Sequence, residues 1–156
     1  MITSILKSIK DIFLGKEIFI DDPRIGVLSE RVLSKDPDKP YSWVSEHRLP
    51  HQNEKTTFIV DGNFEGPFPA QLSVIYRILD ELKDIKQKVD KELRKNAAIP
   101  DTLTTWPAEF YLSSLIPLDS ETLEFELIFE AEDPEEMTYV SAVWLNGKLG
   151  DIALNI

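Results

Sequence analysis

A one-sided apolar stripe in the middle of the chain constrains the fold more than any other feature. Its members recur at steps of three and four residues, which predicts a helix of about seven turns. A helix with one apolar face must lie on another hydrophobic surface. Arg94 and Lys95 favour a helix end there, and Asn96 is a plausible terminator. The stripe consists of Leu72, Ile75, Tyr76, Leu79, Leu82, Ile85, Val89 and Leu93.

Strand patterns precede this helix. Residues Lys16 to Ile20 and Ile25 to Leu33 read as a hairpin-like pair around a turn that contains Pro23. Tyr41 to Leu49 alternates as a half-buried strand does, and Thr56 to Val60 is a short β-branched run. The sequence therefore predicts that the surface beneath the helix is a sheet.

Strand patterns also follow the helix. Apolar residues alternate mainly with glutamates from Leu123 to Glu130, which predicts a strand with one buried face and one wet face. Met137 to Leu145 and Lys148 to Leu154 form the next pair of strands, joined by a two-residue Asn-Gly turn. In this register Trp144 faces Leu149, so we expect both side chains in the core.

These elements predict an α+β fold in a chain of 156 residues with 42% hydrophobic content. We expect an antiparallel sheet of about six to seven strands, packed against one long central amphipathic helix. Residues 1–15 are expected to form an N-terminal amphipathic helix that packs on the core, with Gly15 at its end. The alternative is a helix that lies on a membrane or docks on a partner. The whole chain, 1–156, is then a single domain with its α+β core at 16–156, and no stretch is apolar enough for a membrane span.

The charge of the chain is concentrated in one segment. Residues 96–147 contain eleven carboxylates and no Lys or Arg, whereas residues 1–95 carry 16 basic and 16 acidic side chains. A net charge of -11 disfavours nucleic acid as a partner and favours a basic protein. Such a run can also be only a solvated surface. The partner-binding residues predicted from it are Glu124, Glu126, Glu130, Glu132, Asp133, Glu135 and Glu136.

Signals for enzymatic chemistry are weak. His47 and His51 are the only histidines, and their spacing of four suits zinc ligands on a helix, but Pro50 between them prevents a regular helix. The run from Asp61 to Gly66 resembles the start of a calcium loop, yet its twelfth position is Leu72 rather than a carboxylate. There is no cysteine and no nucleophile motif. We expect no catalytic residues, no metal and no cofactor.

The order of these patterns resembles a group of small bacterial domains of unknown function, which includes immunity proteins that neutralise polymorphic toxins. The resemblance covers most of the chain, from about Ile18 to Ile152, and rests on aliphatic and turn positions. It implies a fold more than an activity, and it implies no functional residues. The matching segments are Asp22 to Gly26 with Leu28, Trp43, Thr57 to Gly62, Pro69 to Leu72, Leu123 to Leu127, and Val143 to Leu149.

Three functional hypotheses follow from the sequence. The first is a cytoplasmic, non-enzymatic interaction domain, an immunity-type inhibitor that binds a basic toxin or another basic protein through the acidic strand face. The second is a small hydrolase or metal-dependent enzyme built around His47 and His51. The third is a structural subunit that oligomerises through Trp43, Trp106 or Phe110.

Overall fold

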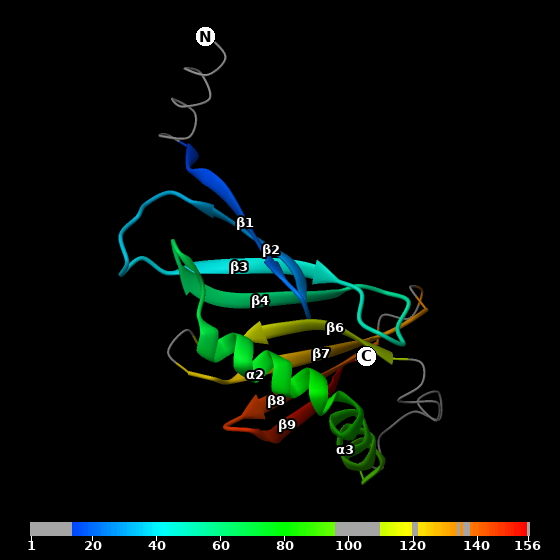
Figure 1. Cartoon of the computed structure of the whole chain (residues 1–156). Coiled ribbons are helices and arrows are strands. Elements are labelled where there is room, and N and C mark those ends of the chain that lie inside the picture. The colour runs from blue at the N-terminus through cyan, green and yellow to red at the C-terminus, as the bar shows by residue number, and fades with distance from the viewer. Residues whose placement is uncertain (1–13, 96–109, 120–121, 134, 136–137, 156) are drawn as a thin grey trace, which may run out of the picture.

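The computed structural model describes residues 14–95, 110–119, 122–133, 135 and 138–155, which form one mixed sheet with two helices on one of its faces (Figure 1). The sheet has nine strands. In chain order the elements are β1 (Lys16–Asp22), β2 (Gly26–Val32), β3 (Tyr41–His47), β4 (Thr56–Asn63), β5 (Gly66–Pro67), α2 (Pro69–Asp80), α3 (Leu82–Lys95), β6 (Phe110–Pro117), β7 (Phe125–Ala131), β8 (Tyr139–Leu145) and β9 (Lys148–Asn155).

Two antiparallel halves make up the sheet. Its strand order is β1-β2-β3-β4-β6-β7-β8-β9, and the short β5 pairs with β4. Strands β4 and β6 meet in the middle and run parallel, with Thr57 opposite Ser114 and Phe58 opposite Leu115. A parallel connection requires a crossover, and α2 and α3 lie on that crossover. Both helices therefore lie on the face of the sheet over which the chain crosses from β4 to β6.

The core lies between the helices and the sheet. Ile75 and Ile78 of α2 and Ile85 and Val89 of α3 are fully buried. From the sheet, every second residue of the central strands is buried against them, as burial of one sheet face requires. The largest of these side chains are Trp43, Trp144, Phe58, Phe125 and Phe129.

The predicted count of six to seven strands in an antiparallel sheet is wrong. Two strands were missed, and the sheet is mixed rather than antiparallel. Strand β6 escapes the period-two pattern because its register shifts between Leu112 and Ser114, so that Leu112 and Ser113 are both buried. Strand β5 has only two residues and carries no pattern.

The prediction of one long helix is also wrong, because the helix is broken at Glu81. This residue has φ -95° and ψ 3°, and α2 ends before it while α3 begins after it. The apolar spacing continues across the break, with Ile78 buried before it and Ile85 buried after it. After the break the helix contacts a different part of the sheet, since α2 contacts β4 whereas α3 contacts β9 (Figure 1).

Other predictions are confirmed. β1 and β2 form an antiparallel pair, and Trp144 is paired with Leu149 around the Asn146-Gly147 turn, whose φ values of 49° and 81° are both positive. Trp144 is buried, and Leu149 packs against the core. The helix predicted for residues 1–15 lies, except for Leu14 and Gly15, outside the described residues. No described helix is long and apolar enough to span a membrane.

Candidate functional site

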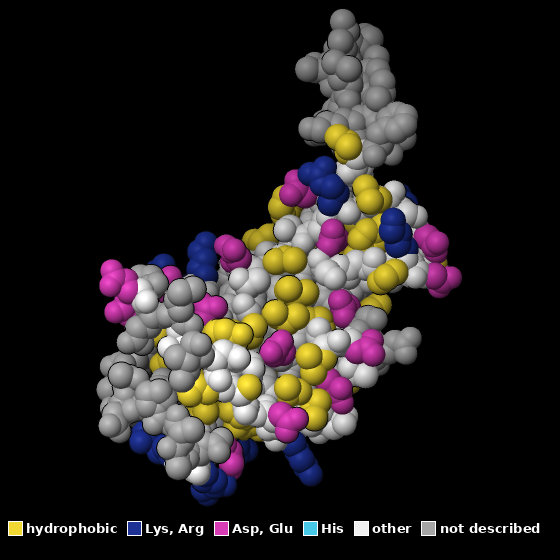
Figure 2. Space-filling model, turned by 180° about the vertical axis from the view of Figure 1, so that it is seen from behind, with side chains coloured by type: hydrophobic (Ala, Val, Ile, Leu, Met, Phe, Trp, Pro, Cys, Tyr) yellow, Lys and Arg dark blue, Asp and Glu magenta, His cyan; other side chains and the backbone are white. Residues whose placement is uncertain are grey.

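The face of the sheet opposite α2 and α3 is not covered by any described helix, and we call it the open face. Figure 2 shows it with acidic side chains interspersed among apolar ones and with basic side chains at its margins. Successive side chains of a strand point to opposite faces of the sheet, and this alternation, which we call strand parity, decides which residues lie on the open face. Since Phe125, Leu127 and Phe129 are buried against the helices, the residues adjacent to them in the sequence point outward.

Three of these outward residues form a line along β7 and the residue before it. We call Glu124, Glu126 and Glu130 the acidic row. Glu126 is paired with Ile116 of β6 on one side and Val143 of β8 on the other. Across the described residues, no Lys or Arg forms an ion pair with any member of the row.

Two tyrosines flank the last member of the row. Glu130 is paired with Tyr111 of β6 and with Tyr139 of β8, and the Tyr111 hydroxyl donates a hydrogen bond to its Oε2 at 3.1 Å. Partial burial, together with the charge and the hydrogen bond of Glu130, raises the pKa of Tyr111 to about 12. The hydroxyl therefore remains a donor at neutral pH and orients the carboxylate.

More carboxylates reach the open face from elsewhere in the sheet. By the same parity, Asp21 of β1 and Glu46 of β3 point to it, and so does Asp151 of β9. Glu17 of β1 lies there too, 4.0 Å from Arg31, and Glu46 lies 3.7 Å from Lys55. The open face is therefore acidic across both halves of the sheet, with its ion pairs toward the β1 side.

Basic side chains gather on the other side of the molecule. Helix α3 has the sequence LKDIKQKVDKELRK, with Lys83, Lys88 and Lys91 among its exposed residues. Helix α3 has six basic and three acidic residues, whereas Glu17, Asp21 and Glu46 of the same segment point to the open face. This separation strengthens the negative potential of the open face.

The other residues predicted to bind a partner do not join the row. Glu132 follows β7, lines a pocket on the helix side and accepts a hydrogen bond from Asn53 at 3.3 Å. Asp133 and Glu135 lie in the β7–β8 connection, where Asp133 accepts a hydrogen bond from the Glu135 backbone. Glu136 lies outside the described residues.

Both histidines line that same pocket, which has a volume of about 850 Å³. His47 ends β3 on the helix side, and the exposed His51 follows in the loop with φ 69°. The apolar part of the pocket wall is formed by Leu49, Leu79 and Phe110. We call this space the histidine pocket.

Lys86 is the most unusual charge in the histidine pocket. Its Nζ donates to the backbone oxygen of Phe110 at 2.5 Å, and burial lowers its pKa although the charge of Glu132 opposes this. At the rim, Arg24 and Asp80 form an ion pair of 2.6 Å. Among the residues that the structure describes, no group of three or more His, Asp or Glu is arranged to hold a metal ion.

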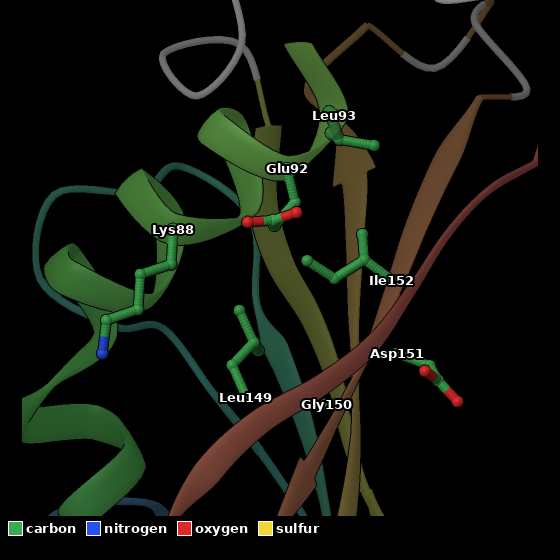
Figure 3. A pocket seen from close by; sticks show the side chains of 7 residues that line it. All are labelled: Lys88, Glu92, Leu93, Leu149, Gly150, Asp151 and Ile152. Atoms are coloured by element: carbon green, nitrogen blue, oxygen red, sulfur yellow. The ribbon is translucent and has the colours of Figure 1, made fainter. Parts of the chain in front are cut away.

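A smaller pocket of about 390 Å³ lies between α3 and β9 (Figure 3). Leu149 and Ile152 reach from β9 toward the helix, where Leu93 forms the opposite wall. Asp151 points to the other side of the strand, as its place on the open face requires. The pocket lies at the sheet edge, and its lining combines these aliphatic side chains with the charged Lys88 and Glu92 of the helix (Figure 3).

Oligomerisation through aromatic residues requires them to be exposed, and the two that the structure describes are buried. Trp43 is fully buried, and its Nε1 donates to the backbone oxygen of Asn63 at 3.1 Å. Phe110 is also buried, and Trp106 lies outside the described residues. Trp43 and Phe110 therefore belong to the core.

Sequence reasoning missed the contribution of the N-terminal strands to the open face. The available signal was the alternation of Ser42, Val44 and Glu46 with buried residues in β3.

Comparisons of the chain with models of known families, with curated proteins and with solved structures gave no match.

Proposed function

We propose that this chain is a non-enzymatic, protein-binding domain whose open face binds a basic protein. The observation that carries the proposal is the acidic row, three carboxylates without an ion-pair partner in the described part of the chain, on an uncovered sheet face. Like charges along a strand repel one another in the free protein. A Lys- or Arg-rich partner would convert that repulsion into attraction.

The surroundings of the row support a protein partner. Ile116 and Val143 flank Glu126, and Tyr111 and Tyr139 flank Glu130. The stems of Lys and Arg can pack on such aliphatic and aromatic surfaces while their charged ends reach the carboxylates. Tyrosines are also enriched in protein interfaces.

Together with the resemblance to immunity proteins, this surface suggests a cytoplasmic inhibitor that covers the basic substrate-binding surface of a toxin. Acidic residues on both sheet halves would steer such a partner toward the open face from a distance. We therefore expect fast association that slows as salt concentration rises.

The test compares wild type with the variant Glu124→Lys, Glu126→Lys, Glu130→Lys. A matched control, Asp38→Lys, Glu65→Lys, Asp84→Lys, changes the net charge equally at exposed positions outside the row. Partners captured from the native host are identified, and their association rates are measured at about 50 and 500 mM salt.

We expect the row variant to lower the association rate with a basic partner by about tenfold or more at low salt, and the control to lower it far less. Equal rates for the row variant and the control would refute the proposal. So would an association rate that does not change with salt.

The histidine pocket favours a second candidate, a small hydrolase or a metal-dependent enzyme, because it brings His47 and His51 to one concave site. This candidate requires that the double variant His47→Ala, His51→Ala lose an activity or a bound metal that wild type has. Metal analysis of the purified protein and assays with ester and phosphoester substrates provide the measurement.

A further inference from the structure

Strand β1 forms one edge of the sheet and has the features of a strand that pairs. It runs regularly along β2 without a register shift, and Ile18, Phe19 and Ile20 make its centre apolar. Phe19 is 62% exposed. Regular edge strands with apolar centres readily accept another strand.

The opposite edge, β9, is protected from such pairing. Its register with β8 shifts between Ala142 and Trp144, and Gly150 and Asp151 lie in its middle. A bulge at an edge, or a charge in the middle of an edge strand, discourages the addition of another strand, whereas β1 has no bulge and its charged residues lie at its two ends. The two edges of the sheet therefore differ in kind.

Exposed apolar side chains also concentrate near β1. Most of the large hydrophobic residues that are exposed in the described structure lie at this end of the sheet, and they include Phe19, Val27 and Val44 on the open face. Ser29 of β2 is paired with Phe19 of β1 and with Val44 of β3. Val27 lies two positions before Ser29, on the same face of β2. A concentration of this kind marks a contact surface.

We propose that two copies of this chain pair antiparallel through β1, about a two-fold axis that passes through Phe19 perpendicular to the sheet. Such an axis keeps each face of the sheet on its own side, so paired residues share a face. In this register Phe19 meets the partner subunit's Phe19, and Ile18 meets the partner subunit's Ile20. Lys16 then meets the partner subunit's Asp22.

The charges of β1 select this register over its neighbours. Moving the centre to Ile20 would place Phe19 opposite the partner subunit's Asp21, and moving it to Ile18 would place Phe19 opposite the partner subunit's Glu17. Both shifts also shorten the overlap of the seven-residue strand. Of these three registers, only the one centred on Phe19 pairs all three central residues, Ile18, Phe19 and Ile20, with apolar residues.

One contact in the proposed register is unfavourable. Glu17 meets the partner subunit's Asp21 on the open face, although Arg31 lies 4.0 Å from Glu17 and offsets part of the repulsion. Because a strand edge buries little surface, we expect a weak dimer with a dissociation constant of about 10 to 500 µM. The pairing would join two open faces into one continuous, bivalent surface.

The experiment measures the dimerisation constant of the full chain by sedimentation velocity from about 5 µM to about 1 mM. Phe19→Asp should raise the dissociation constant about tenfold or more, because two carboxylates would then face each other at the centre. Asp21→Lys should lower it about threefold or more, because the only repulsive contact becomes attractive on both sides of the axis.

Two control variants separate β1 from other surfaces. Tyr139→Asp places the same charge at an exposed aromatic position on the open face of β8, and Asp151→Lys reverses a charge on the β9 edge. Both should leave the constant within about twofold of wild type. A wild type that stays monomeric at about 1 mM would overturn the proposal. A dimer that responds to the controls but not to Phe19→Asp and Asp21→Lys would also overturn it.

Discussion

A hydrogen bond from Tyr76 to Asp22 connects helix α2 to the β1–β2 turn. Asp22 accepts hydrogen bonds from the backbone nitrogens of Arg24 at 2.9 Å and Ile25 at 3.0 Å, and from the Tyr76 hydroxyl. The Arg24 guanidinium lies over the Tyr76 ring, 5.0 Å from its centroid. Tyr76→Phe therefore removes one hydrogen bond to a carboxylate and keeps the ring contact.

A hydrogen bond to a charged group contributes about 1.5 to 3 kcal/mol, and the partial exposure of this pair favours the lower value. We expect Tyr76→Phe to lower the free energy of unfolding by about 1.5 kcal/mol at pH 8. For a chain of 156 residues this lowers the melting temperature by about 4 °C. Urea titrations followed by circular dichroism measure the change, and the slope with urea should stay constant.

The difference between wild type and Tyr76→Phe should shrink in alkali. Burial first, then the hydrogen bond and charge of Asp22, raise the pKa of Tyr76 from 10.0 to about 12. The unfolded chain therefore loses this proton first, so the contribution is complete below pH 10 and is lost as pH rises toward 12. Solvent screening limits the loss to about 1 kcal/mol.

The measurement is best made in the Tyr111→Phe background, because the pKa of Tyr111 is also about 12. In that background, the cost of Tyr76→Phe should fall from about 1.5 kcal/mol at pH 8 to about 0.5 kcal/mol at pH 11.5. A cost that is the same at both pH values would refute the reasoning. So would a Phe variant as stable as wild type at pH 8.

Two further predictions concern the parallel pairing of β4 with β6, which we call the β4–β6 seam, and the β8–β9 hairpin. Thr56→Val should lower the free energy of unfolding by about 1 to 2 kcal/mol in urea titrations, because the buried Thr56 hydroxyl donates to the Leu112 oxygen at 2.6 Å across the β4–β6 seam; Thr56→Ser should cost clearly less, and equal costs would contradict this role. Gly147→Ala should lower the melting temperature by about 3 to 6 °C, because φ is 81° there, in the left-handed region that alanine disfavours. Gly147→Asn, which tolerates positive φ better, should lose less, and the idea fails if Ala is tolerated equally well.

Local patterns predicted most of the strands but not how the halves join. The β1–β2 and β8–β9 pairs were found because their turns and alternation lie within short segments. The β4–β6 seam joins residues more than 50 positions apart, and β6 breaks its alternation at Ser113. No local signal states that two such segments run parallel.

The helix break illustrates a second limit. Within 70–95 there is no Pro or Gly, the residues that usually mark a kink. The apolar stripe passes through Glu81 without interruption, so periodicity alone describes a straight helix. The two helices contact different strands, α2 on β4 and α3 on β9, and that placement is a property of the assembled sheet.

The acidic row was predicted because parity is local: burial of Phe125, Leu127 and Phe129 fixes the outward direction of Glu124, Glu126 and Glu130. Parity ends with the strand, which is why Glu132 turns to the histidine pocket instead. The charge of the open face as a whole could not be predicted in this way. It arises because folding places Asp21 of β1 and Glu46 of β3 on the same face of the sheet as the row, while the lysines of α3 lie on the other side. A segment that is neutral in sequence thereby adds carboxylates to the acidic face.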